Sequence, residues 1–191
     1  MVTSAANISP LTPERWHDFI RLFGEKGGCA GCFCMWWRIS VKEFEIQKGY
    51  KNRDAMEKLV HSGKIPGILL YQENEPVGWC SLGPRENFPR LQRSQILKPI
   101  DDEPVWSIVC FFIAKNFRRK GMSGKLVNGA IRFANENDAK ILEAYPIDTS
   151  ENYPAAFAFT GLASTFRKAG FEEVSRRSSK RPIMRLKLEK S

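Results

Sequence analysis

The feature that most constrains this chain is an apolar run that passes through a basic turn into a glycine-containing helix. Nearly every residue of Val105–Ile113 is apolar, as expected of a strand buried on both faces at the centre of a sheet. After the turn, apolar residues recur at the spacing of an amphipathic helix, at Leu126, Val127, Ala130, Ile131 and Ala134. A buried strand that leads into a helix predicts an α/β domain built around one mixed sheet.

The remaining periodicity predicts a single α/β domain over residues 1–191. Helices are predicted at about 13–25, in a short segment capped by Ser40, and from Asn52 or Arg53 to His61. Strands are predicted at 68–72, 77–82, 141–145, 171–174 and 182–188. A late helix is predicted from Phe159 through Phe166 to a stop at Gly170. A chain of 191 residues is long enough to bury a core without disulfide or metal staples.

No segment predicts a membrane partner or an export signal. The longest apolar stretch, Val105–Ala114, is too short to span a bilayer. The first ten residues lack the charged start and the apolar run of a signal peptide. A reducing cytoplasm is therefore expected, with the five cysteines as thiols.

The formal net charge is +9, and two basic clusters stand out, at Arg118–Lys120 and at Arg176–Arg181. Basic surface binds nucleic acid through phosphate contacts, and a smaller ligand with several phosphates would use the same charges. A solvated basic surface without a specific partner explains the clusters at least as well as nucleic acid does. Nucleic acid is therefore not the favoured partner.

The turn at Gly121 is suited to an anionic ligand. A helix N-terminus has unpaired N–H groups and a partial positive charge, and both favour phosphate. Gly121 and Gly124 have no Cβ atom, so the backbone can approach an anion closely. Arg119 stands where a Walker A loop needs its first glycine, and the three glycines of a dinucleotide-binding loop are absent. When the two glycines are considered by themselves, a tight turn that binds no ligand explains them about equally well.

The segment Arg118–Gly124 resembles the acetyl-CoA loop of the GNAT acetyltransferases. In that family the loop reads Arg or Gln, two residues, Gly, one residue, then Gly or Ala, and Ser123 is the one departure. The segments Phe111–Phe117 and Phe166–Val174 resemble the family's central strand and its late helix with a Gly–Phe ending. The order and spacing of the three segments make the resemblance much more specific than the loop alone.

The resemblance implies the GNAT fold, a single mixed and mostly antiparallel sheet in which the central strand splays from its neighbour. Acetyl-CoA is then the expected cosubstrate, with its pyrophosphate bound by Arg118, Arg119, Lys120, Gly121, Met122, Ser123 and Gly124. Backbone groups of Phe111, Phe112 and Ile113 are expected to pair with the pantetheine arm as an added strand does. The acetyl group would lie at the mouth of the resulting slot.

Acetyl transfer to an amine needs the neutral amine as nucleophile. A lysine-like amine is neutral in only about one of 2,500 molecules at pH 7, a deficit of roughly 4.6 kcal/mol. A general base or a desolvating site must supply this difference. Glu143 is the predicted base, because burial in the apolar segment 141–145 would raise its pKa. Glu86, Asp101 and Asp102 are the alternatives.

The catalytic acid of the family has no direct counterpart. In many relatives a Tyr four residues before the Gly–Phe pair protonates the CoA thiolate, and here Phe166 occupies that position. Phe159 stands where the family often has an Asn that contacts the cofactor. Tyr145 is the predicted substitute acid, with Tyr153, Ser164 and Thr165 as alternatives. Weak acid assistance would suffice, because the CoA thiolate, whose thiol has a pKa of about 8.5, is a fairly good leaving group.

The segment Cys29–Arg38 is rich in thiols and aromatic rings. Cys29, Cys32 and Cys34 have a spacing that could ligate zinc, but a structural site needs four ligands, and only His17 and His61 could add one. A packed loop with buried thiols is the preferred interpretation. No metal is therefore expected.

The aromatic residues of this segment are predicted to line the acceptor site. Trp36 and Trp37 are placed on one wall of that site, because the region after the first helix often covers it in the superfamily. Arg85 and Glu86 are placed on the opposite wall, in the segment that leaves the strand before the central one. Ordinary core packing is the competing interpretation of the two Trp residues.

Together these features predict an N-acetyltransferase that transfers acetyl from acetyl-CoA to a primary amine by direct attack. A thiol relay through Cys110 is disfavoured, because a buried apolar cysteine is normally inert. A CoA-binding regulator without catalysis and a basic nucleic-acid-binding module are the alternative functions. The acceptor is expected to be a small-molecule or peptide amine, and a homodimer is compatible with the sequence.

Overall fold

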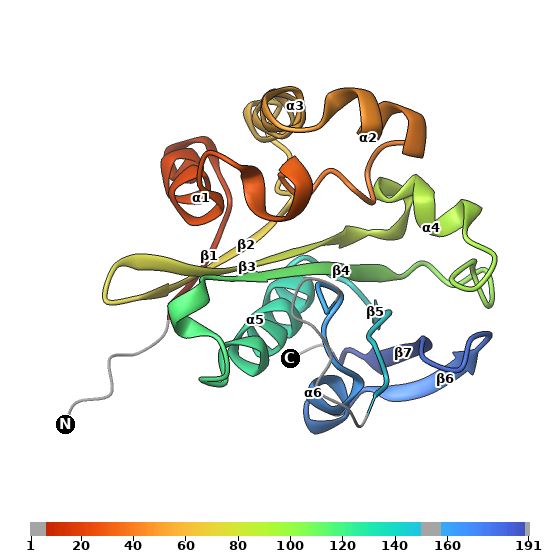
Figure 1. The fold of residues 1–191 in the computed structure, drawn as a ribbon. Helices are drawn as coiled ribbons and strands as arrows, with labels where there is room; N and C mark the ends of the chain where they lie inside the picture. Colours follow the sequence, from red (N-terminus) through yellow and green to blue (C-terminus); the bar gives the residue numbers. More distant parts are fainter. Residues whose placement is uncertain (1–6, 150–157, 190–191) are drawn as a thin grey trace.

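The computed structural model of the protein describes residues 7–149 and 158–189, which are built around one seven-stranded sheet (Figure 1). The strands are β1 (Asn7–Pro10), β2 (Gly67–Gln72), β3 (Glu75–Pro84), β4 (Trp106–Ile113), β5 (Ile141–Ala144), β6 (Glu172–Arg176) and β7 (Pro182–Lys187). Their order across the sheet is β1-β2-β3-β4-β5-β7-β6. Neighbouring strands are antiparallel except β4 and β5, which run parallel. The predicted single, mixed and mostly antiparallel sheet is confirmed.

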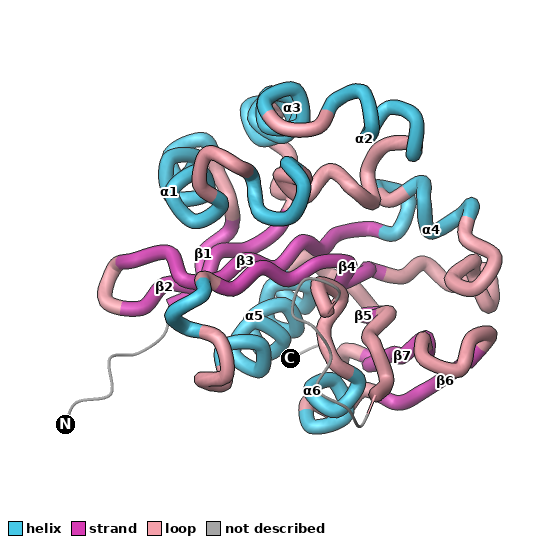
Figure 2. The backbone as a smooth tube through the Cα atoms, in the orientation of Figure 1, coloured by secondary structure: helices cyan, strands magenta, loops and turns pink. Residues whose placement is uncertain are grey.

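Helices cover both faces of this sheet (Figures 1 and 2). On one face lie α1 (Trp16–Phe23), α2 (Val41–Gln47) and α3 (Tyr50–His61), and on the other lie α5 (Met122–Glu136) and α6 (Ala163–Lys168). The short α4 (Pro89–Arg93) follows β3. Side chains alternate along β2, so Leu70 packs in the core beneath α5 and Leu69 packs in the core beneath α1. None of the helices in the described residues is long and apolar enough to cross a membrane.

The parallel pair at the centre of the sheet is short and opens into a fork. β4 pairs with β5 only through Trp106–Ile108 and Leu142–Ala144, although β4 itself continues to Ile113. The register between β3 and β4 shifts at Val109, and such a bulge bends a strand locally. Beyond this bulge, one edge of β4 pairs with β3, and no described strand pairs with the other.

The predicted elements agree with the structure apart from their ends and two short segments. The first helix ends at Phe23 instead of residue 25, because Gly24 adopts a left-handed φ of 66°. The late helix begins at Ala163 instead of Phe159, because Gly161 with φ 82° interrupts the helical pattern. The sequence does not predict β1 or α4, which have four and five residues and are too short to show a clear period.

Candidate functional site

The turn before α5 presents an open and positively charged surface. Gly121 is the N-cap of α5 and adopts a left-handed φ of 75°, which favours glycine. A Cβ atom built on Gly121 or Gly124 would meet no described atom within 4 Å. Residues 118–120 are exposed beside them, and the first turn of α5 contains no acidic residue. Backbone N–H groups and three cationic side chains therefore lie at one open surface, which suits an anion.

The edge of β4 that faces away from β3 is hydrogen-bonded to the chain's own groups. The Phe111 N–H donates to the carbonyl oxygen of Phe159 at 2.5 Å. The Arg118 Nε donates to the carbonyl oxygen of Ile113 at 3.0 Å. Phe111 and Ile113 are two of the residues whose backbone is predicted to pair with pantetheine. A cofactor arm that uses these groups must therefore displace the contacts of Phe159 and Arg118.

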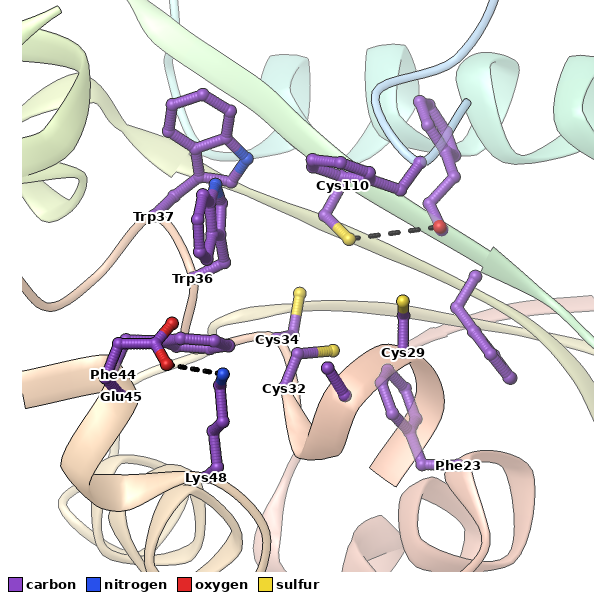
Figure 3. Close-up of a pocket in the computed structure, with 14 residues that line it drawn as sticks. Phe23, Cys29, Cys32, Cys34, Trp36, Trp37, Phe44, Glu45, Lys48 and Cys110 are labelled. Carbon is purple, nitrogen blue, oxygen red and sulfur yellow. Dashed lines mark hydrogen bonds and ion pairs between the residues drawn. The ribbon is translucent and has the colours of Figure 1, made fainter. Parts of the chain in front are cut away.

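A cavity of about 280 Å³ lies beside this part of β4, on the face that carries α1 and α2 (Figure 3). Its wall comes from β4, from the end of α1 and the loop that follows it, from α2 with the adjoining Lys48, and from Phe159. β4 contributes three consecutive residues, Cys110, Phe111 and Phe112. Trp36 and Trp37, which the sequence places at an acceptor site, both lie on this wall.

The helix α2 places the polar rim of the cavity. It begins with the predicted capping box, in which the Glu43 N–H donates to Ser40 Oγ at 3.2 Å and the Ser40 N–H donates to the Glu43 carboxylate at 2.8 Å. Further along the helix, Glu45 forms an ion pair of 2.5 Å with Lys48. These two are the only charged side chains among the described residues that line the cavity.

The aromatic wall contains an unpaired donor. The Trp36 ring meets Phe44 edge to face, with centroids 4.9 Å apart, and the Arg90 guanidinium lies 3.7 Å from the Trp36 centroid. Trp37 is only 9% exposed, and its Nε1 has no hydrogen-bond partner among the described residues. A buried N–H without a partner is destabilising, so the packing of the Trp37 ring has to offset this cost.

Four thiols line the same cavity, at Cys29, Cys32, Cys34 and Cys110. The Trp79 Nε1–H donates to the Cys34 sulfur at 3.1 Å. Burial opposes ionisation of Cys34, but hydrogen bonds from Cys110 and Trp79 and the charge of Arg38 lower the pKa of its thiol to about 7. The hydrogen bond to Cys34 and burial together raise the pKa of the Cys110 thiol well above its usual value. Cys34 is therefore the cavity thiol that ionises near neutral pH.

The first two cysteines of this loop have different surroundings. The Cys32 thiol donates to the carbonyl oxygen of Gly27 at 3.4 Å, and Cys29 is exposed. Within residues 7–149 and 158–189, no group of three or more His, Cys, Asp or Glu side chains is placed to hold a metal ion.

A buried ionic network joins the strands at the closed end of the fork. Arg85, which follows β3, donates to Glu143 Oε1 at 2.6 Å, to the carbonyl oxygen of Leu97 at 2.6 Å and to the Tyr145 hydroxyl. The Tyr145 hydroxyl donates to Glu143 Oε1 at 2.6 Å and lies 2.8 Å from the Ser107 hydroxyl of β4. Burial and the adjacent Glu143 charge raise the pKa of Tyr145 well above its usual value. Charge-assisted hydrogen bonds therefore connect β4 and β5 to the end of β3.

Both carboxylate oxygens of Glu143 are engaged. Arg185 of β7 donates to Glu143 Oε2 at 2.7 Å, and it also donates to the two oxygens of Asp101 at 2.6 and 2.9 Å. Glu143 itself is 1% exposed. Hydrogen bonds from Arg185 also lower the pKa of Asp101. The role of Glu143 as general base stays a prediction, and the geometry favours a positioning role because two guanidinium groups and a hydroxyl already use its oxygens.

The other predicted site residues lie away from the cavity. Arg85 belongs to the buried network and Glu86 is exposed, and neither lines the cavity. Phe166 is fully buried, with its ring centroid 5.9 Å from that of Phe111. Of the alternative acids, Ser164 is exposed and Thr165 is half-buried, both on α6, and Tyr153 lies outside the described residues. Asp102 is exposed.

The basic cluster at 176–181 is largely used in contacts within the chain. Arg176 forms ion pairs of 2.6 Å with both Asp148 and Glu173. Arg177 donates to the carbonyl oxygen of Lys98 at 2.6 Å, and Arg181 donates to that of Tyr145 at 3.4 Å. These contacts reduce the positive charge that this surface offers to nucleic-acid phosphates.

Sequence reasoning does not identify the partners of Glu143. Met184 and Leu186 alternate onto one apolar face of the predicted strand. Arg185 lies between them and is therefore assigned to the opposite face. The strand register places Arg185 and Ser107 directly opposite Glu143, on its two neighbouring strands. Register of this kind depends on the folded sheet, and no local sequence signal reports it.

Comparison with known proteins relates the chain to acetyltransferases. A model of the acetyltransferase (GNAT) family matches residues 30–161. No curated protein matches the sequence.

Several solved structures share the fold at low sequence identity. A GNAT-family acetyltransferase from Listeria monocytogenes 4b F2365 has a TM-score of 0.58 and 10% identity, covering 96% of this chain and 95% of that chain. A GNAT-family acetyltransferase from Streptococcus agalactiae 2603 has a TM-score of 0.57 and 12% identity, covering 100% of this chain and 99% of that chain. PaiA N-acetyltransferase from Thermoplasma acidophilum was solved in complex with coenzyme A. It has a TM-score of 0.53 and 13% identity, covering 96% of this chain and 99% of that chain.

Removing the carboxylate at the centre of the buried network is expected to destabilise the fold. Glu143→Ala leaves the buried Arg85 without its counter-charge, so the free energy of unfolding should fall by about 3–5 kcal/mol. Glu136→Ala is the matched control, because Glu136 is exposed and 3.9 Å from Arg132, and it should change stability by no more than about 0.5 kcal/mol. Urea unfolding measures both, and equal stability of the two variants would contradict the network's importance.

Alkylation should distinguish Cys34 from the other cavity thiols. The rate of Cys34 modification by iodoacetamide should rise through a pKa near 7, while Cys110 should react only at much higher pH. Trp79→Phe removes an N–H that stabilises the thiolate, so the midpoint for Cys34 should move to higher pH. Peptide mass spectrometry follows each site, with exposed Cys29 as the internal reference. A Cys34 midpoint at the ordinary thiol value of about 8.5 would show that these contacts do not act on it.

Proposed function

Because the chain belongs to the acetyltransferase (GNAT) family, we propose that it transfers the acetyl group of acetyl-CoA to a primary amine held in the cavity beside β4. Family membership gives the general activity, which is acetyl-CoA-dependent acetyl transfer. The observation that carries the finer proposal is the edge of β4 beyond Ile108, which β5 leaves uncovered. This edge leads from the cavity at Cys110–Phe112 to the turn before α5.

The turn before α5 is the proposed pyrophosphate site. The N–H groups of Met122, Ser123 and Gly124 belong to the first turn of a 15-residue helix whose N-cap provides no side-chain hydrogen bond. Orphan donors of this kind, with the cations of residues 118–120 beside them, match a diphosphate in charge and in hydrogen bonding. The open space at the Cβ position of Gly124 leaves room for the ligand.

The pantetheine arm is proposed to run along Phe111–Ile113 as an additional strand. The Phe159 carbonyl accepts a hydrogen bond from the Phe111 N–H. Phe159 thus holds the place that the arm takes, and its carbonyl moves away when the cosubstrate binds. Because Phe159 also lines the cavity, binding of acetyl-CoA and the shape of the acceptor cavity are coupled.

The transfer itself needs no covalent enzyme intermediate. The amine nitrogen attacks the thioester carbonyl carbon, a C–N bond forms, and the C–S bond breaks. The CoA sulfur leaves with the electron pair of that bond and takes the proton that the attacking nitrogen loses. One amide and one CoA thiol are produced for each acetyl group.

Desolvation is the proposed source of the neutral amine. The described lining of the cavity has one carboxylate, Glu45, and Lys48 neutralises it. Apolar surroundings disfavour the ammonium form and lower its pKa, so the amine loses its proton as it enters. Glu143 and Tyr145 act as positioning residues that hold β5 against β4 at the closed end of the fork.

A charge placed at Gly124 tests the pyrophosphate site. Gly124→Glu should weaken acetyl-CoA binding by at least about tenfold, because a carboxylate at the helix N-terminus repels the diphosphate. Gly124→Gln has the same size without the charge and is the matched control. Both variants should fold normally, since the added side chain points into open space and replaces glycine inside a helix. Calorimetric titration measures the Kd, and wild-type affinity for the Glu variant would rule out this site.

A further inference from the structure

The wall of the cavity beside β4 brings together thiols that the proposed acetyl transfer does not use, and we propose that Cys34 and Cys110 form an oxidation site there. Hydrogen peroxide converts this pair to a disulfide, which links the loop that follows α1 to β4. Oxidation of the pair does not depend on the proposed function, because it concerns the two sulfurs and not the transfer of an acetyl group.

Strand register and loop docking place the two thiols together. Cys110 lies opposite Ser81 of β3, and Trp79 lies two residues from Ser81 on the same face of that strand. The loop docks on these β3 residues, because the Trp79 Nε1–H donates to the Cys34 sulfur at 3.1 Å and Arg38 Nη2 donates to Ser81 Oγ at 3.3 Å. Cys110 packs against the core cluster that contains Cys34. The two thiols share a hydrogen bond, and their sulfurs point toward one another (Figure 3).

The surroundings of the pair favour one thiolate. The charges that act on Arg38 are those of Cys34 and Cys110, and the buried Arg38 Nε has no hydrogen-bond partner among the described residues. A guanidinium withdrawn from water needs an anion beside it. Burial opposes ionisation of Cys34, but its hydrogen bonds and the Arg38 charge bring the pKa of its thiol to about 7. Cys34 can therefore supply the thiolate, which is the form that reacts with peroxide.

The cavity gives a small oxidant a route to the pair. Both residues line the cavity, and Cys110 is half-buried. Cys34 itself is only 4% exposed, so a molecule of the size of hydrogen peroxide suits this site better than a larger oxidant does.

Oxidation proceeds in two steps and consumes one hydrogen peroxide. The Cys34 thiolate attacks a peroxide oxygen, so an S–O bond forms and the O–O bond breaks. The hydroxide that leaves takes a proton from the solvent and becomes water, and Cys34 becomes a sulfenic acid. The Cys110 sulfur then attacks the Cys34 sulfur, so an S–S bond forms and the S–O bond breaks. The departing oxygen takes up the Cys110 proton as a second water, and both sulfurs have been oxidised.

The first step prepares Cys110 for the second. The hydrogen bond to Cys34 and burial, together with the Cys34 charge, raise the pKa of the Cys110 thiol. Because the sulfenic acid is uncharged, its formation removes the effect of the thiolate, and Cys110 loses its proton more readily.

The other two thiols of the cavity wall provide matched controls. Cys29 is exposed. The Cys32 thiol donates to the carbonyl oxygen of Gly27 at 3.4 Å, and burial raises its pKa to about 11. Cys32 therefore stays protonated at neutral pH, although it lies only two residues from Cys34.

Disulfide mapping of the full-length protein tests the site. The protein is treated with hydrogen peroxide at neutral pH, unfolded with iodoacetamide present to block free thiols, and digested with trypsin without reductant. The peptide that contains Cys110 should be linked to the peptide of residues 27–38, and dithiothreitol should release it. Tandem mass spectrometry should place the link at Cys34. A wild-type digest in which Cys110 stays free, or is linked to Cys29 or Cys32, overturns the proposal.

Serine variants make the same assignment independently. The link to Cys110 should persist in Cys29→Ser and Cys32→Ser, which retain the pair, and disappear in Cys34→Ser. A link that survives in Cys34→Ser contradicts the pair. Thermal unfolding of each variant checks that the fold is retained.

Unfolding by urea tests whether the fold already holds the two sulfurs in place for the bond. A disulfide between groups in contact restricts the unfolded chain without straining the native state, so oxidation should raise the urea midpoint of the wild-type protein. The midpoint of Cys34→Ser should not change on the same treatment. An unchanged or lower midpoint for the wild-type protein with the link formed would show that the bond strains the fold, and would contradict the proposed placement of the pair.

Discussion

The buried pair of Arg85 and Glu143 is the interaction on which the central fork depends. The carboxylate of β5 is tied to β7 by Arg185, to the end of β3 by Arg85, and to β4 through the hydroxyls of Tyr145 and Ser107. Charges this deeply buried are tolerated only when each has a partner. The pairing therefore fixes β5 against β4 at Trp106–Ile108. Beyond that point β4 keeps its position in the sheet through β3 on one edge only.

The fork divides the site into two approaches that meet at one strand. The basic turn before α5 lies at the far end of β4, and the apolar cavity lies beside Cys110–Phe112 on the face of α1 and α2. The loop after α1, the helix α2 and Phe159 are distant in sequence from β4. They meet it where β5 leaves its edge unpaired. Phe159 belongs to both regions, because its carbonyl bonds to the edge of β4 and its residue lines the cavity. In the proposed function, the fork lets a long anionic cosubstrate and an amine acceptor reach the same atoms from different sides.

Local chemistry explains what the sequence could predict. The apolar run at 105–113, the capping box at Ser40 and the glycines of the α5 turn are local signals, and the elements they predict are present. The family resemblance, and not the local pattern, placed Trp36 and Trp37 at an acceptor site. Both line the cavity beside β4, and their contact with an acceptor stays a prediction. Glu143 shows the limit: its place in an apolar strand correctly indicated burial, but its partners come from residues 85 and 185. Those contacts follow from sheet register, which local patterns do not encode. Phe159 likewise fits a helical spacing, yet Gly161 ends that pattern before α6.

A crystal structure of the protein with CoA bound would test the role of the fork most directly. The pyrophosphate is expected within hydrogen-bonding distance of the N–H groups of residues 122–124. The pantetheine arm is expected on the Phe111 N–H, with the Phe159 carbonyl displaced from its present position. CoA bound elsewhere, or bound with the Phe111–Phe159 hydrogen bond intact, would contradict the assignment of the β4 edge to the cosubstrate.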